Sequence, residues 1–412
     1  MTVNKKQPWK TEHWFVSPWN YLPEVTRDFQ PPKQVKIHDI TLRDGEQQAG
    51  ITFTKDDKIR IAEKLAEVGV HRIEAGMPAV SPQDEAAIKE IVKRNLGPEI
   101  FCFSRCMVDD VKRAADCGVK GVVMEIPSSE HLIKHAYQWP VEKAIDLSIK
   151  ATLAAKEMGL YTVFFTIDAT RADMDWFLNL IERVATEGHM DALTLVDTFG
   201  VLSPHGAWYF TKKVKERINK PLEIHFHADF GLAVANTIMS VLAGAEVIHS
   251  TVTGIGERAG NTPMEETVLA LLTLYGIDVG IKYNKLNELA QLVRELSATE
   301  IPRNRPYIGD IAYDIESGIV TSWFKNAWKE YPTDVFPVHP DFVGHRHTKI
   351  VMGKKSGLDN IAIWSEKLGI RLDKEEATEV LMQVKQRAYD LRRPLNEDEF
   401  RQIVNGVKAK KG

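Results

Sequence analysis

Cysteine is scarce in this sequence, and long apolar runs are absent. The 412 residues include only three cysteines, Cys102, Cys106 and Cys117, and so small and odd a number argues against a disulfide framework and is typical of a reducing compartment. No run of about 18 apolar residues occurs, so we expect no membrane-spanning helix. Residues 1–10 lack the apolar segment of a signal peptide. We therefore expect a cytoplasmic protein that has no membrane partner and whose cysteines are buried thiols.

An excess of charge of one sign is also missing. Lys and Arg number 53 and Asp and Glu number 57, which gives a formal net charge of −4. The chain thus lacks the basic surface that nucleic acids require, and we expect no nucleic-acid partner. Its composition, with 44% hydrophobic and 27% charged residues, is that of an ordinary globular protein. These values exclude disordered, collagen-like and disulfide-scaffold proteins.

From Gln34 onward, short apolar runs alternate regularly with amphipathic stretches. Strands that alternate with helices form parallel βαβ units, and eight such units in roughly 245 residues have the size of a TIM barrel. The alternative, a doubly wound open sheet, normally has a Gly-rich turn after its first strand, whereas here the acidic sequence Arg43–Gln47 follows. We therefore predict a (β/α)8 TIM barrel. The predicted strands are Val35–Leu42, Arg72–Met77, Ile100–Phe103, Gly121–Ile126, Tyr161–Ile167, Ala192–Asp197, Leu222–His227 and Val247–Val252.

The residues on either side of the predicted barrel have a different pattern. Residues 1–33 are rich in aromatics and proline and show no clear period, so we predict an N-terminal arm that packs on the body of the protein or on a partner subunit. After the barrel, assigned to 34–280, the alternation stops. We predict a smaller, mostly helical C-terminal region over 281–412, in which 304–347 is irregular because it is rich in Pro, Gly and aromatics.

Polar residues follow three of the predicted strands, where barrel enzymes carry their catalytic groups. Asp44 follows the first strand, and His225 and His227 end the seventh. Residues i and i+2 of a strand point to the same face, so the two imidazoles and a carboxylate are candidate ligands of a divalent metal. The pattern alone leaves open that the pair are structural histidines. After the eighth strand, the loop Thr253–Asn261 contains three glycines, which permit close backbone approach to a ligand, and Asn261 offers a further oxygen.

Together these segments resemble the HMG-CoA lyase-like metallolyases, a TIM-barrel family with a pyruvate carboxyltransferase domain. They are most similar to its Claisen-condensing branch, the 2-isopropylmalate, homocitrate and citramalate synthases. The resemblance covers about Val35 to Tyr275 and continues more weakly beyond it. The matching segments are His38–Gln47, Leu195–Gly200, His225–His227, Gly231–Asn236 and Gly254–Asn261.

This resemblance implies roles for individual residues. Arg43 matches the arginine that stabilises the enolate oxygen, which suits a guanidinium because it is always charged and bonds two oxygens at once. Thr198 matches a substrate-contacting threonine, and His131 matches a histidine near the 2-oxo acid, with a surface histidine as the alternative. The implied ligands of Mn²⁺, Mg²⁺ or Zn²⁺ are Asp44, His225, His227 and Asn261. The expected substrate contacts are Phe165, Ile167, Gly254, Gly256 and Arg258.

The implied function is that of a metal-dependent acyltransferase of amino-acid biosynthesis. Such an enzyme joins an acyl-CoA to a 2-oxo acid through an enolate, and its homodimer places the C-terminal region over the partner's barrel. Two alternatives remain: a metal-dependent lyase or aldolase that cleaves a 3-hydroxy acid or 3-hydroxyacyl-CoA, and a non-catalytic paralogue that binds a metabolite.

The sequence departs from the synthases at positions associated with acid–base chemistry. Phe165 and Ile167 occupy the places of a serine and a glutamate, and Val320 occupies that of a histidine. The glutamate and histidine associated with deprotonating acetyl-CoA are thus replaced by apolar residues. We therefore expect weak turnover of acetyl-CoA by this route. Alternatively, the natural substrate presents an apolar group to these residues, or another residue serves as the base. The candidates for such a base are Glu74, Asp168, His345 and His347.

Overall fold

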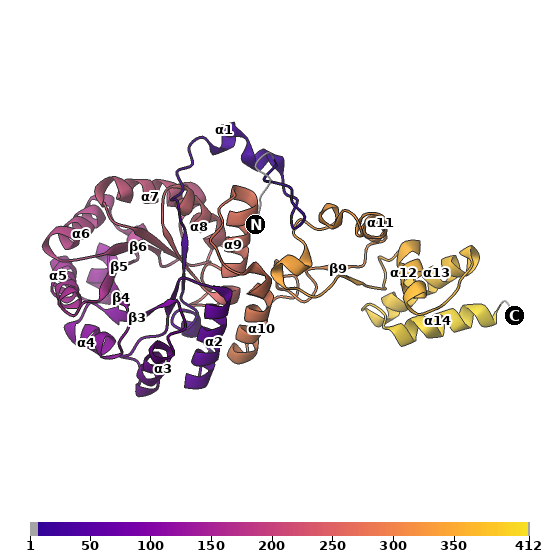
Figure 1. Ribbon diagram of the computed structural model, residues 1–412, viewed down its shortest axis with the longest axis horizontal. Helices are drawn as coiled ribbons and strands as arrows, with labels where there is room; N and C mark the ends of the chain where they lie inside the picture. The colour runs from indigo at the N-terminus through magenta and orange to yellow at the C-terminus, as the bar shows by residue number, and fades with distance from the viewer. Residues whose placement is uncertain (1–6, 411–412) are drawn as a thin grey trace. The chain divides into compact units, whose positions relative to one another are not determined.

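The computed structural model describes residues 7–410, which form two compact units. One unit, the barrel unit, runs from Trp19 to Ile301. The other, the C-terminal unit, combines the described residues up to Pro18 with those from Pro302 onward (Figure 1). Among residues 7–410, no helix combines the length and the apolar character needed to cross a membrane.

The barrel unit contains eight parallel strands that close on themselves, because β1 pairs with both β2 and β8. Each strand lies within or overlaps one of the predicted apolar runs, and the predicted TIM barrel is confirmed. The strands are β1 (Lys36–Asp39), β2 (Arg72–Glu74), β3 (Glu99–Arg105), β4 (Gly121–Pro127), β5 (Tyr161–Ile167), β6 (Ala192–Asp197), β7 (Leu222–Phe226) and β8 (Val247–Ser250).

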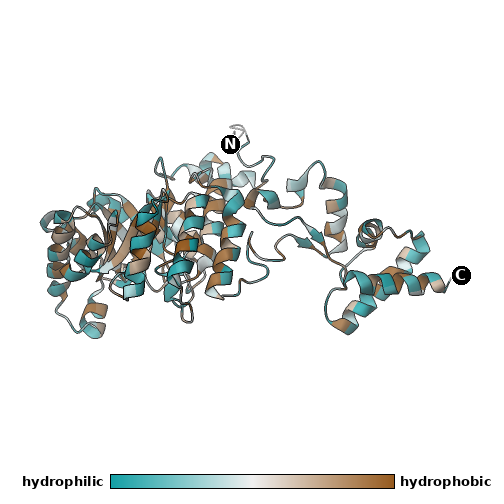
Figure 2. Ribbon diagram, turned by 60° about the horizontal axis from the view of Figure 1, so that its bottom comes forward, coloured by the Kyte–Doolittle hydropathy of each residue, from teal (hydrophilic) through white to brown (hydrophobic). Residues whose placement is uncertain are grey.

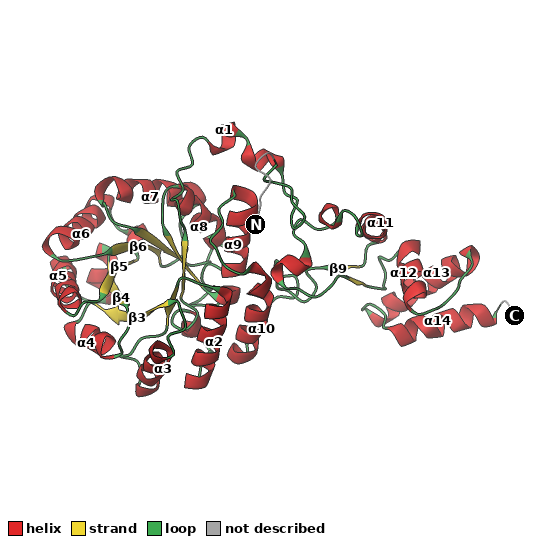
Figure 3. Ribbon diagram, viewed as in Figure 1, coloured by secondary structure: helices red, strands yellow, loops and turns green. Residues whose placement is uncertain are grey.

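Amphipathic helices surround the strands, as Figure 3 shows. Figure 2 distinguishes their hydrophilic and hydrophobic residues by colour. The first long helix shows why they form where they do. Thr54 accepts a hydrogen bond from the Asp57 amide and caps the N-terminus, and Gly69, with a φ of 92°, ends the helix. The helices are α1 (Pro23–Thr26), α2 (Lys55–Val68), α3 (Pro82–Lys93), α4 (Val108–Asp116), α5 (Val141–Glu157), α6 (Met174–Glu187), α7 (Pro204–Arg217), α8 (Ala233–Leu242), α9 (Met264–Tyr275) and α10 (Leu286–Ser297).

The barrel unit extends beyond residues 34–280 at both ends, because neighbouring segments pack on it. The Tyr21 hydroxyl donates to the carbonyl oxygen of Thr273 at 2.6 Å. Lys64 of α2 and Glu288 of α10 form an ion pair of 2.6 Å. These contacts join part of the N-terminal segment and the first helix after the barrel to the barrel unit.

The interior of the barrel is divided into a polar half and an apolar half. In the polar half, strands β1, β2, β7 and β8 contribute charged or ionisable residues, and the ion pair between Arg72 of β2 and Glu223 of β7, at 2.7 Å, crosses the interior. In the apolar half, strands β3 to β6 contribute hydrophobic residues. The buried ionisable residues of the polar half are His38, Arg72, Glu74, Glu223, His225 and His249. The buried cluster of the apolar half is Phe101, Phe103, Val123, Val163, Phe165, Ala192 and Val196.

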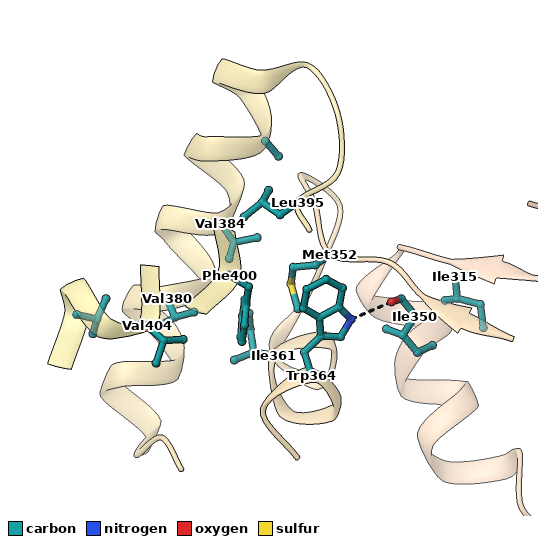
Figure 4. Packing of buried hydrophobic residues seen from close by; sticks show 12 residues of the cluster. Ile315, Ile350, Met352, Ile361, Trp364, Val380, Val384, Leu395, Phe400 and Val404 are labelled. Atoms are coloured by element: carbon teal, nitrogen blue, oxygen red, sulfur yellow. Dashed lines mark hydrogen bonds between the residues drawn. The ribbon is translucent and has the colours of Figure 1, made fainter. Parts of the chain in front are cut away.

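The C-terminal unit has its own hydrophobic core, shown in Figure 4. The indole of Trp364 packs in this core and donates to the carbonyl oxygen of Ile350 at 2.8 Å. The described residues before Trp19 belong to the same unit. Among them, Trp14 is buried and forms an antiparallel β-bridge with Val338. The elements are β9 (Asp314–Ile315), α11 (Gly318–Ala327), β10 (Lys349–Ile350), α12 (Leu358–Lys367), α13 (Lys374–Leu391) and α14 (Glu397–Ala409).

One expectation about this unit is wrong. The segment 304–347, expected to be irregular, contains helix α11. Val320 and Phe324, one helical turn apart, pack against the core of the C-terminal unit, and this packing stabilises a helix that is short and flanked by irregular chain. The prediction of a mostly helical C-terminal region is confirmed.

Candidate active site

A cavity of about 220 Å³ lies at the ends of the strands where the predicted polar residues gather. Its lining comes from seven of the eight strand ends or the loops that follow them, so both halves of the interior contribute to it. The lining residues are Arg43, Asp44, Gln47, Phe103, Glu125, Phe165, Ile167, Val196, Thr198, His225, His227, Glu257 and Arg258.

Asp44, His225 and His227 form a buried cluster whose candidate ligand atoms all lie within 4.8 Å of one another. The Nε2 atoms of the two histidines are 3.2 Å apart, and Asp44 Oδ2 is 3.3 Å from His225 Nε2. Two imidazole nitrogens and a carboxylate oxygen that face one another suit a divalent ion of borderline softness. The structure thus unites the three residues that the sequence proposes as ligands.

Local backbone geometry brings these three residues together. After β1 the chain turns tightly, so that the amides of Arg43, Asp44 and Gly45 all donate to the carbonyl oxygen of Ile40 at 2.9–3.1 Å. His225 lies in β7 and His227 directly follows it, two residues on, so both imidazoles lie on the same side of the strand.

Asn261 joins this cluster through the glycine-rich loop. Its Nδ2 donates to Asp44 Oδ1 at 2.7 Å, while its Oδ1 is buried and has no hydrogen-bond partner among the described residues. A Cβ atom on Gly256 would lie 2.0 Å from Asn261 Nδ2, and one on Gly260 would lie 2.0 Å from the Gly254 oxygen. The loop therefore closes around Asn261 only with glycine at these positions, and Asn261 Oδ1 is a candidate fourth ligand.

Burial and neighbouring charges hold these groups in the forms that bind metal. Burial lowers the pKa of His225 to about 3 and also lowers the pKa of His227. Burial would raise the pKa of Asp44, but the Arg43 guanidinium and His225 outweigh it and hold that pKa well below its ordinary value. Neutral imidazoles and an ionised carboxylate are the protonation states that a metal ion requires, so the residues present fit a divalent ion.

Two of the guanidinium nitrogens of Arg43 are hydrogen-bonded, and the third has no partner among the described residues. Its Nη1 donates to Asp44 Oδ2 at 2.6 Å, and its Nε donates to Glu74. The guanidinium carbon lies 3.9 Å from the centre of the Phe103 ring. Nη2 is buried and has no partner among the described residues. A fixed cation with a spare donor in this cavity is suited to an oxyanion.

Behind Arg43 lies a buried network that sequence reasoning did not find. Glu74 Oε2 is 3.2 Å from His38 Nε2, whose ring stacks on that of His249 at 4.4 Å. His249 in turn contacts Glu223 at 2.8 Å, and Glu223 pairs with Arg72. Burial would raise the pKa of Glu74, but Arg43 and His38 outweigh it and lower that pKa to about 2. His38, Glu223 and His249 also have the spacing of a metal site, but Arg43 and Arg72 already balance the two carboxylates, so we interpret the network as support for Arg43.

Two predicted substrate contacts line the cavity, and each has a hydrogen-bond partner beside it. Thr198 Oγ1 accepts a hydrogen bond from the Asp168 amide at 2.8 Å. Arg258 Nε and Nη2 each donate to a carboxylate oxygen of Asp229 at 2.9 Å.

Three other predicted residues do not line the cavity. Gly254 and Gly256 shape the loop around Asn261 instead. His131 lies with its Nε2 3.0 Å from Asp168 Oδ2 and its side chain 43% exposed.

The residues proposed from the sequence as substitute bases are already engaged. Asp168 accepts hydrogen bonds from Arg171 and, at 2.6 Å, from Ser129. Glu74 is paired with Arg43. In the C-terminal unit, His345 lies with Nε2 3.0 Å from the Gly309 oxygen, and the His347 side chain is 90% exposed. Neither Asp168 nor Glu74 offers a free carboxylate to the cavity.

Phe165 and Ile167 line the cavity together with Phe103 and Val196 and form its apolar wall. The rings of Phe165 and His225 form a T-shaped pair, with 4.9 Å between the ring centres. One acidic residue, Glu125, lies beside this wall, because its strand pairs it with Phe165. Sequence reasoning missed Glu125, although it is the one charged residue inside the apolar run Gly121–Ile126.

Comparison with known proteins gives relatives over nearly the whole chain. Homocitrate synthase AksA of Methanothermobacter thermautotrophicus is 36% identical over 96% of this chain and 98% of its own length. A putative (R)-citramalate synthase of Archaeoglobus fulgidus is 42% identical over 86% of this chain and 71% of its own length. A probable 2-isopropylmalate synthase of Ignicoccus hospitalis is 39% identical over 91% of this chain and 93% of its own length.

Solved structures share the fold of the barrel. HMG-CoA lyase of Bacillus subtilis superposes with a TM-score of 0.60 at 21% identity, covering 66% of this chain and 96% of the lyase. The sequence model of the family described as HMGL-like matches residues 34–293, which include the strands of the barrel, the Asp44–His225–His227 cluster and the glycine-rich loop. With that match and relatives of this identity and coverage, the chain belongs to the HMGL-like family, as its motifs predict.

Proposed function

We propose that this protein is a divalent-metal-dependent acyltransferase that joins an acyl-CoA to a 2-oxo acid by a Claisen condensation. The observation that carries the proposal is that one cavity unites the Asp44–His225–His227 cluster with the spare donor of Arg43. The curated relatives named above are synthases of homocitrate, citramalate and 2-isopropylmalate. They bear out the prediction of a synthase-type enzyme, whereas the lyases share the fold alone.

The proposed ligands are Asp44, His225, His227 and, through its unpaired Oδ1, Asn261. Mn²⁺, Mg²⁺ and Zn²⁺ each accept nitrogen and oxygen ligands of this kind. When bound, such an ion supplies Lewis-acid polarisation of a carbonyl oxygen. The chain's own part is to hold the ligands in their deprotonated forms, which burial and Arg43 accomplish.

Arg43 is proposed to bond the oxygen that becomes negatively charged during the reaction. Glu74 and Asp44 hold its guanidinium in place, so Nη2 can donate to that oxygen without reorganisation of the side chain. Preorganised donors of this kind typically contribute about 3–4 kcal/mol to the stability of the transition state.

The remaining proposed contacts surround this centre. Thr198 and Arg258 offer polar groups to the carboxylate of the 2-oxo acid, and Phe165 and Ile167 offer an apolar surface to its side chain. Gly254 and Gly256 hold the loop in place, and His131 remains a proposed contact of the 2-oxo acid. We expect acceptors with apolar side chains to be preferred.

A panel assay tests the proposal. Metal-loaded protein is incubated with pairs drawn from short acyl-CoAs and short 2-oxo acids, and release of the free CoA thiol is followed. We expect thiol release that requires both substrates and disappears after chelation. If no pair reacts but a 3-hydroxyacyl-CoA is cleaved, the protein is a lyase. If 2-oxo acids bind and nothing reacts, it is a metabolite-binding paralogue.

We further propose a cytoplasmic homodimer organised as an arm (1–33), a catalytic barrel (34–280) and a C-terminal region (281–412). The three buried, unbonded cysteines support a reducing compartment. Helix α11 supports a subunit interface, since it exposes Ile319 and Trp323, one helical turn apart, to 68% and 54%. Sedimentation at micromolar concentration tests the dimer, and a monomer would contradict it.

A further inference from the structure

We propose that Glu125 is the general base that removes the proton from the acyl-CoA in this cavity. The assignment depends on the proposed condensation and adds to it a residue that neither the family motifs nor the sequence pattern singled out. Ile167 and Val320 make the usual positions of the base and its partner apolar, so another residue must remove the proton. Glu125 is the residue proposed for this step.

The position of Glu125 on β4 directs its side chain to the interior at the catalytic end of the barrel. Val123, two residues earlier, belongs to the buried cluster of the apolar half, and residues i and i+2 of a strand share a face. Only Ile126 and Pro127 follow Glu125 in β4, so it lies near the C-terminal end, where barrel enzymes place catalytic groups. It lines the same cavity as Arg43, Asp44 and His225.

The Glu125 carboxylate is unengaged, unlike the other buried acids at this site. Asp44 is bonded to Arg43 and Asn261, and Glu74 is bonded to Arg43. Within residues 7–410, no donor forms a hydrogen bond or ion pair with the Glu125 side chain. Glu257 also lines the cavity but is exposed to solvent. A half-buried carboxylate without a partner is therefore free to accept a proton from a substrate.

The surroundings of Glu125 also make it a stronger base. Burial raises its pKa above the ordinary value, although Arg43 and Arg105 act in the opposite direction. A carboxylate whose pKa rises toward the working pH transfers protons more effectively in a general-base step. Burial in this cavity thus favours Glu125 as a base.

The proposed step conserves atoms and electrons. The Glu125 carboxylate takes a proton from the carbon next to the thioester carbonyl, and the C–H electron pair forms the C=C bond of the enolate as the carbonyl pair moves onto oxygen. The enolate carbon then forms the new C–C bond to the carbonyl carbon of the 2-oxo acid. The carbonyl π pair of the acid moves onto its oxygen, which takes up a proton, and water hydrolyses the thioester to release CoA.

The test compares Glu125→Gln with the wild type, using an acyl-CoA and 2-oxo acid pair that reacts in the panel assay. We expect kcat to fall by about 10²- to 10⁴-fold, the usual contribution of a general base, while KM for the 2-oxo acid and the metal content stay unchanged. A second readout isolates the proton step: in D₂O, the wild type should exchange deuterium into the acyl group of the acyl-CoA, and Glu125→Gln should not.

Two further variants separate chemistry from folding. Glu125→Asp keeps the carboxylate and should recover part of the exchange, which a purely structural position would not require. Glu99→Gln changes an exposed glutamate at the N-terminal end of β3, away from the cavity. It removes an ion pair with Arg72 and should keep the exchange and the kcat of the wild type.

Each outcome has a distinct reading. If Glu125→Gln exchanges and condenses at the wild-type rate, the assignment of the base is wrong while the condensation stands. If the wild type itself neither exchanges nor condenses with any pair, the proposed function fails and the assignment fails with it.

Discussion

The two halves of the barrel interior meet the same requirement, a filled core, in opposite ways. The apolar half, on β3 to β6, fills its space with aromatic and branched side chains. The polar half, on β1, β2, β7 and β8, fills the same volume with histidines, glutamates and arginines that neutralise one another. Burying charges costs free energy that hydrophobic packing does not, so a charged interior is expected only where it supports chemistry.

The candidate active-site cavity lies where these halves meet, and each half makes a different contribution. The polar half supplies the candidate metal ligands and the fixed guanidinium of Arg43. The apolar half supplies an apolar wall and, through Glu125, a carboxylate whose pKa is raised by burial. We therefore expect substitutions in the polar half to affect turnover and metal content. In the apolar half, we expect substitutions of the wall residues to affect substrate preference and substitution of Glu125 to affect turnover.

The largest effect is expected from Asp44→Asn, at the metal end of the polar half. Asparagine keeps the shape of the side chain but removes its charge, so metal content and turnover should fall together. Because metal polarisation is worth several kcal/mol, the loss of turnover should reach about 10³-fold. Elemental analysis beside the rate assay checks both. Asp229→Asn, which removes a carboxylate outside the cluster, should keep its metal. Full metal occupancy in Asp44→Asn would remove Asp44 from the ligand set.

Arg43→Lys should cost about 3–4 kcal/mol of transition-state stabilisation, a loss of roughly 10²- to 10³-fold in kcat. Lysine is a point charge and cannot bond Glu74, Asp44 and a substrate oxygen in the fixed geometry of a guanidinium. Metal content should not change. Arg72→Lys, the matched change in the same network but away from the cavity, should lower stability and spare kcat. Equal rates for Arg43→Lys and the wild type would contradict the proposed contact.

Acid should destabilise the barrel unit through the polar half. Burial, with a smaller contribution from His249, lowers the pKa of His38 to about 4. Between its unfolded value of roughly 6.5 and this value, the unfolded chain binds a proton that the folded chain does not. The free energy of unfolding should therefore fall as the pH falls from about 6.5 to 4, by on the order of 3 kcal/mol.

Urea unfolding of the barrel at several pH values measures this dependence. His38→Gln should make the pH dependence shallower, and the part due to His225 and His227 should remain. Val163→Ala, in the apolar half, should lower stability by the same amount at every pH. A His38→Gln variant with the full wild-type dependence would show that other groups are responsible.

The smallest effect is expected from Phe165→Leu in the apolar wall. The smaller side chain enlarges the part of the cavity proposed to receive the acceptor's side chain. A change of this size in an apolar pocket is worth about 1–3 kcal/mol, so preference should shift by tenfold or more toward bulkier 2-oxo acids. Ratios of kcat/KM for a short and a branched acceptor check it, while metal content should remain that of the wild type. An unchanged ratio would place the acceptor elsewhere in the cavity.

Most of the barrel could be predicted from the sequence because its signal is local and repeated. Each strand is a short apolar run, and each helix of the type of α2 carries an apolar stripe, so neighbouring residues alone reveal the period. Helix α11 could not be predicted because the residues that stabilise it lie elsewhere in the chain. Its Val320 and Phe324 pack on the core formed with α12 to α14. No local pattern contains that information.

The candidate site divides in the same way. Asp44, His225 and His227 could be named as candidate ligands from the sequence because their residue types and strand positions suit a metal and because they match the ligands of the family. The role of Glu74 and His38 in supporting Arg43 could not be predicted, because a charged residue in a strand gains meaning only from the partner that neutralises it. These partners come from other parts of the chain.

Sequence alone was sufficient for the eight-stranded barrel, which depends on spacing along the chain, and for the family and the candidate metal ligands, which depend on its motifs. The unpaired Nη2 of Arg43, the polar and apolar halves and the free carboxylate of Glu125 emerged only from the tertiary structure. They depend on which side chains of separate strands face one another across the barrel. In particular, Glu125 is a candidate base because no donor of the described chain reaches its carboxylate and burial raises its pKa, and both conditions arise only when the strands close into a barrel.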